Sequence, residues 1–408
     1  MIPEMTDSIP SSHPEELRTS GSIAYASHNP RANLSIKDVV FEITNETELT
    51  TDTASDSESG NELSDLSTQS CLQQISPYFD VKRTVYGGRG CFASSFIPKG
   101  TIILKSDRPV GSSVAKIFKK EVCSWCFAYH NGKSMKHRLQ SKIYFCSEEC
   151  QSEFVEYDND GTLTTALLSF DDAFAKNECD VEDYEVPEVL DESAIRQIWK
   201  DVEEWDNKIS KMKPTKRTRF LPKLTKDDYA EARYTISVVH SMHQGLSSQV
   251  SNEMELFHTL ESSEPQKVEK YPYLTLAYSN IFKFLRLTCP ESFQKFITPQ
   301  SVRDIIGRNL TNAFGIWSPT TTDDEEREYL GFGVYPSASF FNHSCAYNVK
   351  KSRELNTYIF KTTENIQPGT ELCISYGITG DETLESREAT LSEWFFKCGC
   401  SKCTLERA

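Results

Sequence analysis

Cysteines fall into two tight clusters in this chain of 408 residues, and closely spaced thiols are typical metal ligands. The first cluster is Cys123-x2-Cys126 followed by Cys146-x3-Cys150. Two close pairs, about twenty residues apart, can converge on one tetrahedral zinc ion. Buried free cysteines are the alternative, but the paired spacing favours zinc.

The second cluster is Cys398-x-Cys400-x2-Cys403, close to the C-terminus. Three ligands cannot complete a four-coordinate structural site, so a fourth must come from elsewhere, and Cys345 is a candidate. The other cysteines fit neither cluster, and we interpret them as ordinary core or surface thiols. They are Cys71, Cys91, Cys179, Cys289 and Cys373.

Residues 333–348 read GVYPSASFFNHSCAYN, in which an apolar tract ends abruptly in Asn342-His343-Ser344-Cys345. Burying polar side chains without partners costs free energy, so this run indicates a function rather than simple packing. The sequence offers no convincing Ser-His-Asp triad or pair of carboxylates.

The elements that must position these residues lie at both ends of the chain. Residues 78–106 alternate apolar and polar positions around two glycine-containing turns, which predicts β-hairpins. Residues 161–316 have a helical pattern, with Thr225 and Ser301 as expected N-caps. Strands are expected again over 331–377. The fold class is therefore α+β, with helices inserted between strands that meet in space.

Composition excludes several classes of function. No apolar stretch approaches the roughly 18 residues of a membrane span, and the acidic N-terminus resembles neither a signal nor a transit peptide. We expect an intracellular protein of the nucleus or cytoplasm, where cysteines stay reduced. The net charge of −16 argues against duplex DNA binding.

Residues 1–70 carry 13 acidic and 3 basic side chains, which gives this segment a charge of −10. Rich in Ser, Thr and acids, the segment cannot bury enough apolar surface to offset the entropy of ordering. We expect disorder over 1–76. A solvated tail and a regulated, phosphorylated tail both remain open.

Four motifs in this order, GGRGCFAS, GVYPSASFFNHSC, ELCISYG and CGCSKC, resemble the SET-domain protein lysine methyltransferases. The inserted cysteine segment resembles a MYND zinc finger, so residues 77–408 resemble the SET-and-MYND (SMYD-like) branch. The resemblance implies small β-sheets around a pseudoknot. It divides the chain into a tail (1–76), the N-terminal SET part (77–122), a zinc segment (123–150), a helical insertion (151–316), the SET core (317–380) and a post-SET zinc tail (381–408).

The resemblance also implies transfer of a methyl group from S-adenosylmethionine to a lysine of a protein, histone or non-histone. Tyr376 would be the catalytic residue and would also contact the cofactor, Trp394 would line the lysine channel, and Cys345 would complete the tail zinc site. The other implied cofactor contacts are Gly88, Arg89, Gly90, Asn312, Asn342, His343 and Phe396.

The chemistry suits these residues. The lysine amine must be neutral to attack a methyl group, although its usual pKa is about 10.4. A narrow apolar channel lowers that pKa and aligns the nitrogen, and the hydroxyl of Tyr376 can orient the amine. Tyr335 and Phe341, in contrast, are expected to pack the core.

Two features depart from the family pattern. Only the first zinc site of a MYND finger is present, which puts partner binding through it in doubt. The chain also stops five residues after Cys403, without the C-terminal helical lobe of many relatives, so we expect wider access for a peptide. A catalytically silent SET scaffold that recruits partners is the alternative function. We expect no membrane association and no sequence-specific nucleic-acid binding.

Overall fold

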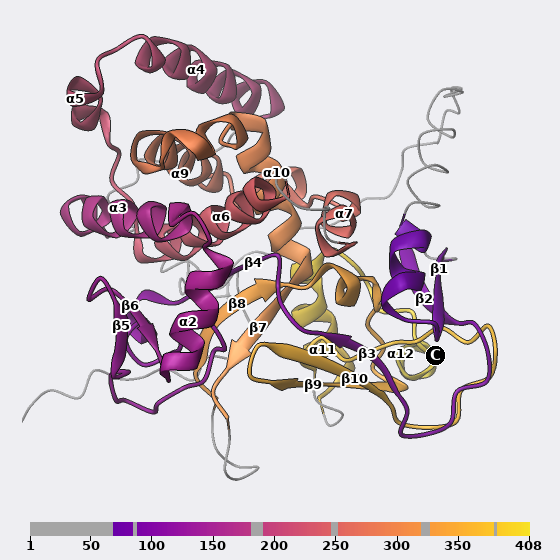
Figure 1. Ribbon diagram of the computed structural model, residues 1–408. Coiled ribbons are helices and arrows are strands. Elements are labelled where there is room, and N and C mark those ends of the chain that lie inside the picture. The colour runs from indigo at the N-terminus through magenta and orange to yellow at the C-terminus, as the bar shows by residue number, and fades with distance from the viewer. Residues whose placement is uncertain (1–67, 85–87, 181–190, 246–251, 320–326, 379–381) are drawn as a thin grey trace, which may run out of the picture.

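Small antiparallel sheets form the lower part of the molecule in Figure 1, and helices form the upper part. The computed structural model describes residues 68–84, 88–180, 191–245, 252–319, 327–378 and 382–408. Within these ranges, no helix is both long enough and apolar enough to cross a bilayer. The expectation of disorder over 1–67 lies outside the described residues.

Strands far apart in the sequence pair with one another. The sheet orders are β1-β2, β3-β10-β9, β4-β8-β7 and β5-β6, and all pairs are antiparallel. The strands are β1 Phe79–Arg83, β2 Arg89–Ala93, β3 Ile102–Ser106, β4 Gly111–Val114, β5 His137–Leu139, β6 Ile143–Phe145, β7 Ala313–Trp317, β8 Tyr329–Val334, β9 Val349–Glu354 and β10 Thr357–Thr362.

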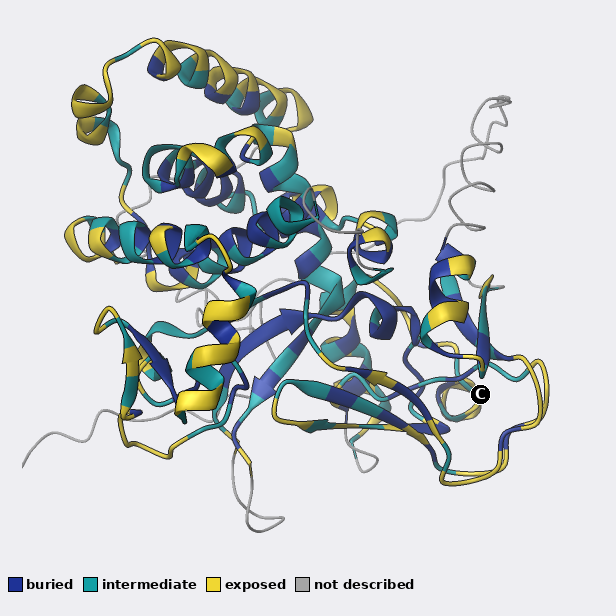
Figure 2. Ribbon diagram, viewed as in Figure 1, coloured by how far each residue is buried: buried dark blue, intermediate teal, exposed yellow. Residues whose placement is uncertain are grey.

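Strand β8 lies between β4 and β7 and is buried along almost its whole length (Figure 2). A central strand covered on both faces needs apolar or small residues at every position, which LGFGV supplies. Gly331 is required here because its φ is +152° and a Cβ would lie 2.1 Å from the carbonyl oxygen of Ser113.

Most helices lie in the chain between the two groups of SET strands, and α11 and α12 follow the last strand. The helices are α2 Glu148–Tyr157, α3 Thr162–Asn177, α4 Glu192–Ser210, α5 Pro214–Arg217, α6 Lys226–Gln244, α7 Asn252–Thr259, α8 Glu264–Lys270, α9 Leu274–Thr288, α10 Pro299–Asn312, α11 Leu384–Leu391 and α12 Ser401–Arg407. Helix α6 packs against β4 and so joins the helical part to the sheets. Helix α4, at the top of Figure 2, has a largely exposed outer face.

Helix starts follow the expected capping chemistry with one correction. Thr225 caps α6 through a capping box with Asp228, as predicted. Ser301 is not the N-cap of α10; that residue is Thr298, and Ser301 closes the box from the third helical position. Both residues carry hydroxyls, so the sequence alone did not separate the cap from its partner three residues later.

Two expected boundaries also shift. Residues 68–75 form a helix, although we expected disorder as far as residue 76. Cys71 and Leu72 of this helix are buried, so it belongs to the ordered part of the protein. The helical insertion ends at Asn312 rather than at 316, because AFGIW forms strand β7 with alternating burial.

The two motif segments lie side by side. The amide of Ile374 donates to the carbonyl of Asn342 over 2.9 Å, and the amide of Ser344 donates to the carbonyl of Ile374 over 3.0 Å. His343 and Ile374 form a parallel bridge. Residues separated by about thirty positions therefore meet, as expected for the crossing of the SET core.

Candidate active site

The end of the β1–β2 loop, where β2 begins at Arg89, lies directly against Asn342. The side-chain amide of Asn342 donates to the carbonyl oxygen of Arg89 over 3.0 Å and to the Oε1 atom of Glu371 over 2.9 Å. A Cβ on Gly90 would lie 2.5 Å from that Oε1 and 2.7 Å from the Nδ2 of Asn342. Gly90 therefore permits an approach that a larger residue would block.

The side chain of Arg89 has other partners. Its guanidinium donates to the hydroxyl of Thr68 over 3.3 Å and to the carbonyl of Thr259, and it lies 5.0 Å from the ring centre of Phe340. Gly88 has a φ of +72°. Arg89 thus anchors this loop to the helix at 68–75 and to α7, while its backbone contacts Asn342.

His343 connects Tyr376 to a cysteine. The Nδ1 atom accepts a hydrogen bond from the amide of Tyr376 over 3.1 Å, and Nε2 lies 3.3 Å from the Sγ of Cys345. Burial lowers the pKa of His343 to about 4, so the ring is neutral. Because Nδ1 accepts, Nε2 carries the proton and donates to the sulfur.

Tyr376 is surrounded by aromatic rings. Its hydroxyl donates to the carbonyl of Phe341 over 3.0 Å, and burial raises its pKa, which keeps the phenol protonated. The ring centres of Trp394 and Phe396 lie 5.9 and 6.2 Å from that of Tyr376. Phe396 also lies 6.3 Å from His343 and is 36% exposed. The partly exposed ring of Phe396 beside His343 is suited to stacking on a purine base.

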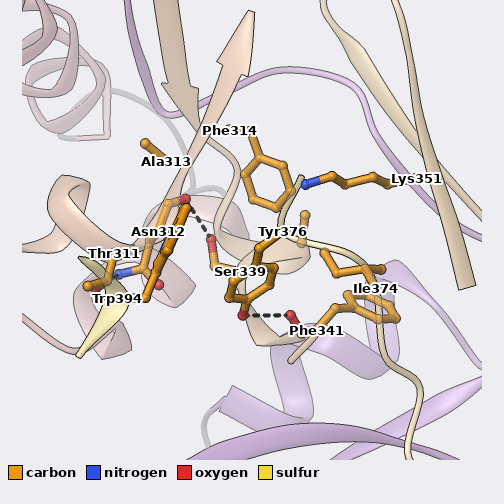
Figure 3. Close-up of a pocket in the computed structure, with 11 residues that line it drawn as sticks. Thr311, Asn312, Ala313, Phe314, Ser339, Phe341, Lys351, Ile374, Tyr376 and Trp394 are labelled. Carbon is orange, nitrogen blue, oxygen red and sulfur yellow. Dashed lines mark hydrogen bonds between the residues drawn. The ribbon is translucent and has the colours of Figure 1, made fainter. Parts of the chain in front are cut away.

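A cavity of about 40 Å³ opens beside Tyr376 (Figure 3). Tyr376 and Trp394 were both predicted to form a lysine channel, and both side chains line this cavity. Aromatic walls exclude water and suit the apolar stem of a lysine. The lining residues are Thr311, Asn312, Ala313, Phe314, Ala338, Ser339, Phe341, Lys351, Ile374, Tyr376 and Trp394.

Lys351 was not predicted for this site. Its amine lies 5.4 Å from the ring centre of Phe314 and 6.0 Å from that of Tyr376. No hydrogen bond or ion pair of Lys351 occurs among the described residues, and burial lowers its pKa to about 8. A strand was expected over this segment, but only the structure reveals that Lys351 of β9 faces the cavity.

Asn312 has a structural role alongside its place in the cavity wall. Its side-chain amide donates to the carbonyl of Arg308 over 2.8 Å, and its own carbonyl accepts from Ser339 over 3.3 Å. Asn312 therefore ends α10 and holds Ser339 against it. Its contact with a cofactor remains a prediction.

Tyr335 and Phe341 are buried, in agreement with their expected core positions. Phe314 was missed as a site residue because an aromatic residue in AFGIW looks like any other buried strand position. Only the placement of β7 beside residues 338–341 shows which face of Phe314 borders the cavity.

The structure brings both predicted cysteine sets together. In each set of four, all sulfur atoms lie within 4.8 Å of one another. Sulfur–sulfur distances include 3.6 Å for Cys126–Cys146 and 3.5 Å for Cys345–Cys403. A tetrahedral zinc ion with bonds of about 2.3 Å requires about 3.8 Å between ligands, so both sets fit zinc.

Comparisons with known proteins agree with these observations. The family model described as SET domain matches residues 88–377. The motifs also predict a close relation to the yeast Set-six protein, and this relation is confirmed. The chain is 31% identical over 365 residues to "Potential protein lysine methyltransferase SET6" of Saccharomyces cerevisiae, which covers 82% of this chain and 97% of the relative.

Two other relatives match over shorter stretches. "Histone-lysine N-methyltransferase ASHR2" of Arabidopsis thaliana is 29% identical over 31% of this chain and 33% of its own. "N-lysine methyltransferase SMYD2" of Homo sapiens is 31% identical over 21% of this chain and 20% of its own. A solved SET domain, titled as LSMT bound to lysine and AdoHcy, has a TM-score of 0.35 at 12% identity over 81% of this chain and 56% of its own, too distant to bear on the site. On the match to its domain model and to the full-length yeast relative, the chain belongs to the SET-domain family.

Proposed function

We propose that this protein is a protein lysine N-methyltransferase that uses S-adenosylmethionine. The observation that carries the proposal is the aromatic cavity of Phe314, Tyr376 and Trp394 lying beside His343. Family membership and the names of the curated relatives support it. These relatives include the yeast protein matched over most of both chains.

The cofactor, when bound, supplies an electrophilic methyl group. The backbone of Gly88–Gly90, the Asn342-His343 segment and the open face of Phe396 would hold it, with Asn312 as a further predicted contact. The geometry fits because Gly90 leaves room for close approach and Phe396 offers a partly exposed ring.

The protein's own residues then act on the incoming lysine. Walls formed by Phe314 and Trp394 exclude water, which lowers the pKa of the substrate ammonium and favours the neutral amine. Tyr376 is fixed by its bond to Phe341 and presents a hydroxyl that can orient the nitrogen. Positioning and desolvation supply the catalysis without a general acid or base triad.

The substrate class and the compartment are further proposals. Any protein with an accessible lysine, histone or non-histone, is compatible with the cavity. Two sets of four reduced cysteines suited to zinc support a site of action in the nucleus or cytoplasm.

A catalytically silent scaffold is the second candidate, and Lys351 is the observation that favours it. Its amine lies in the cavity that a substrate lysine would enter. A cation held there would oppose a second ammonium group.

One experiment separates the two candidates. Protein arrays incubated with labelled S-adenosylmethionine should show labelled proteins with the wild-type chain and none with Tyr376→Phe. In parallel, S-adenosylhomocysteine should raise the melting temperature of both. A thermal shift without any labelling would favour the scaffold, whereas neither signal would refute cofactor binding itself.

A further inference from the structure

A second cavity, of about 80 Å³, lies where the zinc segment, strand β4 and the helices meet. Its walls combine aromatic and aliphatic side chains with hydroxyls and three cationic groups. The lining residues are Arg108, Pro109, Ser112, Ser113, Val114, Lys119, Ser124, Trp125, Phe127, Phe154, Tyr157, Leu163, Leu167, Arg233 and Ser237. None of them belongs to the candidate active site.

Arg108 is held at this cavity between two aromatic rings. Its guanidinium carbon lies 3.6 Å from the ring centre of Trp125 and 4.2 Å from that of Tyr157. The two rings cover the guanidinium, yet no hydrogen bond or ion pair of Arg108 occurs among the described residues. A guanidinium has five N–H donors, and their favoured partner is a two-oxygen anion.

The other two cations share one carboxylate. Lys119 and Arg233 both pair with Asp171, the latter over 2.9 Å, and Tyr229 donates to the same carboxylate over 3.0 Å. Glu153 accepts a hydrogen bond from the indole of Trp125 over 2.6 Å, and its negative charge also attracts the guanidinium of Arg108. Three cations therefore line the cavity against two nearby carboxylates, Asp171 and Glu153, which leaves one positive charge in excess.

A buried hydroxyl also lacks a partner. Ser113 is 4% exposed, lines the cavity, and its Oγ has no hydrogen-bond partner in the structure. A buried polar group in this state carries a desolvation penalty that a bound acceptor would remove. Arg108 lies in the connection between β3 and β4, Ser113 lies in β4, and both border the same space.

We propose that this cavity binds a small oxyanion, a phosphate or a carboxylate, through Arg108 and Ser113. The volume exceeds twice the roughly 30 Å³ that one water occupies in the liquid, which leaves room for a group of four or five heavy atoms. An anion bound in this cavity would lie between Trp125 of the zinc segment and Arg233 of α6, and would so link these two parts of the protein. The site does not depend on the proposed methyl transfer.

Calorimetric titration of the full chain with inorganic phosphate and with acetate, each against sodium chloride at equal ionic strength, tests the proposal. We expect saturable binding of at least one of these anions. Arg108→Gln should weaken it about tenfold or more, because a charge-assisted pair is lost. Arg138→Gln makes the same charge change at an exposed position of β5 and should leave binding unchanged. Binding of phosphate alone identifies a phosphate site, and binding of acetate alone a carboxylate site.

Ser113→Ala protects the test against a folding defect in the Arg108 variant. Removing an unpartnered buried hydroxyl should leave the anion-free protein as stable as the wild type or more stable, yet weaken anion binding several-fold. The variant would thus be at least as stable as the wild type but bind the anion more weakly. If Ser113 had only a structural role, its loss would not weaken anion binding without also lowering stability. Absence of binding to the wild type, or equal binding to wild type and both cavity variants, overturns the proposal.

Discussion

Lys351 places an amine of the protein in the cavity that a substrate lysine would enter. Two ammonium groups in one aromatic cavity repel each other, so substrate entry is favoured when one of them is neutral. The lowered pKa of Lys351, about 8, allows it to lose its proton under mildly basic conditions. When protonated, Lys351 therefore places a positive charge in the site that repels the ammonium group of an entering substrate lysine.

Lys351→Met should raise the melting temperature at pH 7, because it removes an unpaired charge that desolvation disfavours and keeps a side chain of similar shape. The folded pKa of about 8 lies below the unfolded value of about 10.4, so the wild type gains stability as pH rises between these values. The advantage of the variant should therefore shrink from pH 8 to pH 10. Thermal melts across this range are the measurement, with the exposed neighbour variant Lys350→Met as control. An advantage independent of pH would contradict this account of Lys351.

Gly90→Ala should weaken S-adenosylhomocysteine binding about tenfold or more. A Cβ would lie 2.5 Å from Glu371 and 2.7 Å from Asn342, so the loop must move away from the proposed cofactor contacts. Gly245→Ala, at the end of α6 where the backbone is helical with φ of −60°, is the control. Calorimetry on both variants measures the difference, and equal affinities would place the pocket elsewhere.

At the scale of elements, the two cysteine sets have different neighbours. Cys345 of the tail set is joined through His343 to Tyr376, and Phe396 lies two residues before Cys398. The other set is held by the β5–β6 hairpin and the first turn of α2. Of the two sets, the tail set is the one that hydrogen bonds among the described residues connect to the candidate active site.

Cys400→Ser should therefore weaken S-adenosylmethionine binding far more than Cys126→Ser. Loss of one thiolate from the tail set leaves an incomplete zinc site and frees Phe396, whereas loss from the other set destabilises the inserted segment. Titration of both folded variants provides the comparison. If the two affinities agree, the proposed coupling through His343 is wrong.

The sequence motifs predicted several residues of the candidate site, whereas its other residues depend on how the strands pack. Asn342, His343 and Tyr376 stand out in sequence because polar groups follow apolar runs. Lys351 and Phe314 do not, because which face of β9 and β7 borders the cavity depends on packing against residues elsewhere in the chain, such as Tyr376. The same limit explains the helix at 68–75: its burial depends on contacts such as Arg89–Thr68, which local composition does not reveal.

At the scale of the whole molecule, metal content is a direct check. Eight cysteines form two four-sulfur sets, and the other five lie outside them, so purified protein should contain two zinc ions per chain. A strong chelator should lower the melting temperature, because binding energy at structural zinc sites is folding energy. Elemental analysis returning one zinc or none would refute the two-site model.

The pairing of β3 with β10 has a consequence for how the protein is made. Thr101 and Thr362, bonded across this pairing, are 261 residues apart. At ribosomal rates of about 5–20 residues per second, roughly 13–52 s separate their synthesis. During that interval β3 has no partner strand, and unpaired strand edges invite aggregation. Nascent chains halted before β10 should therefore depend on chaperones, and a chain cut short of Cys403 should leave the ribosome without a complete tail metal site.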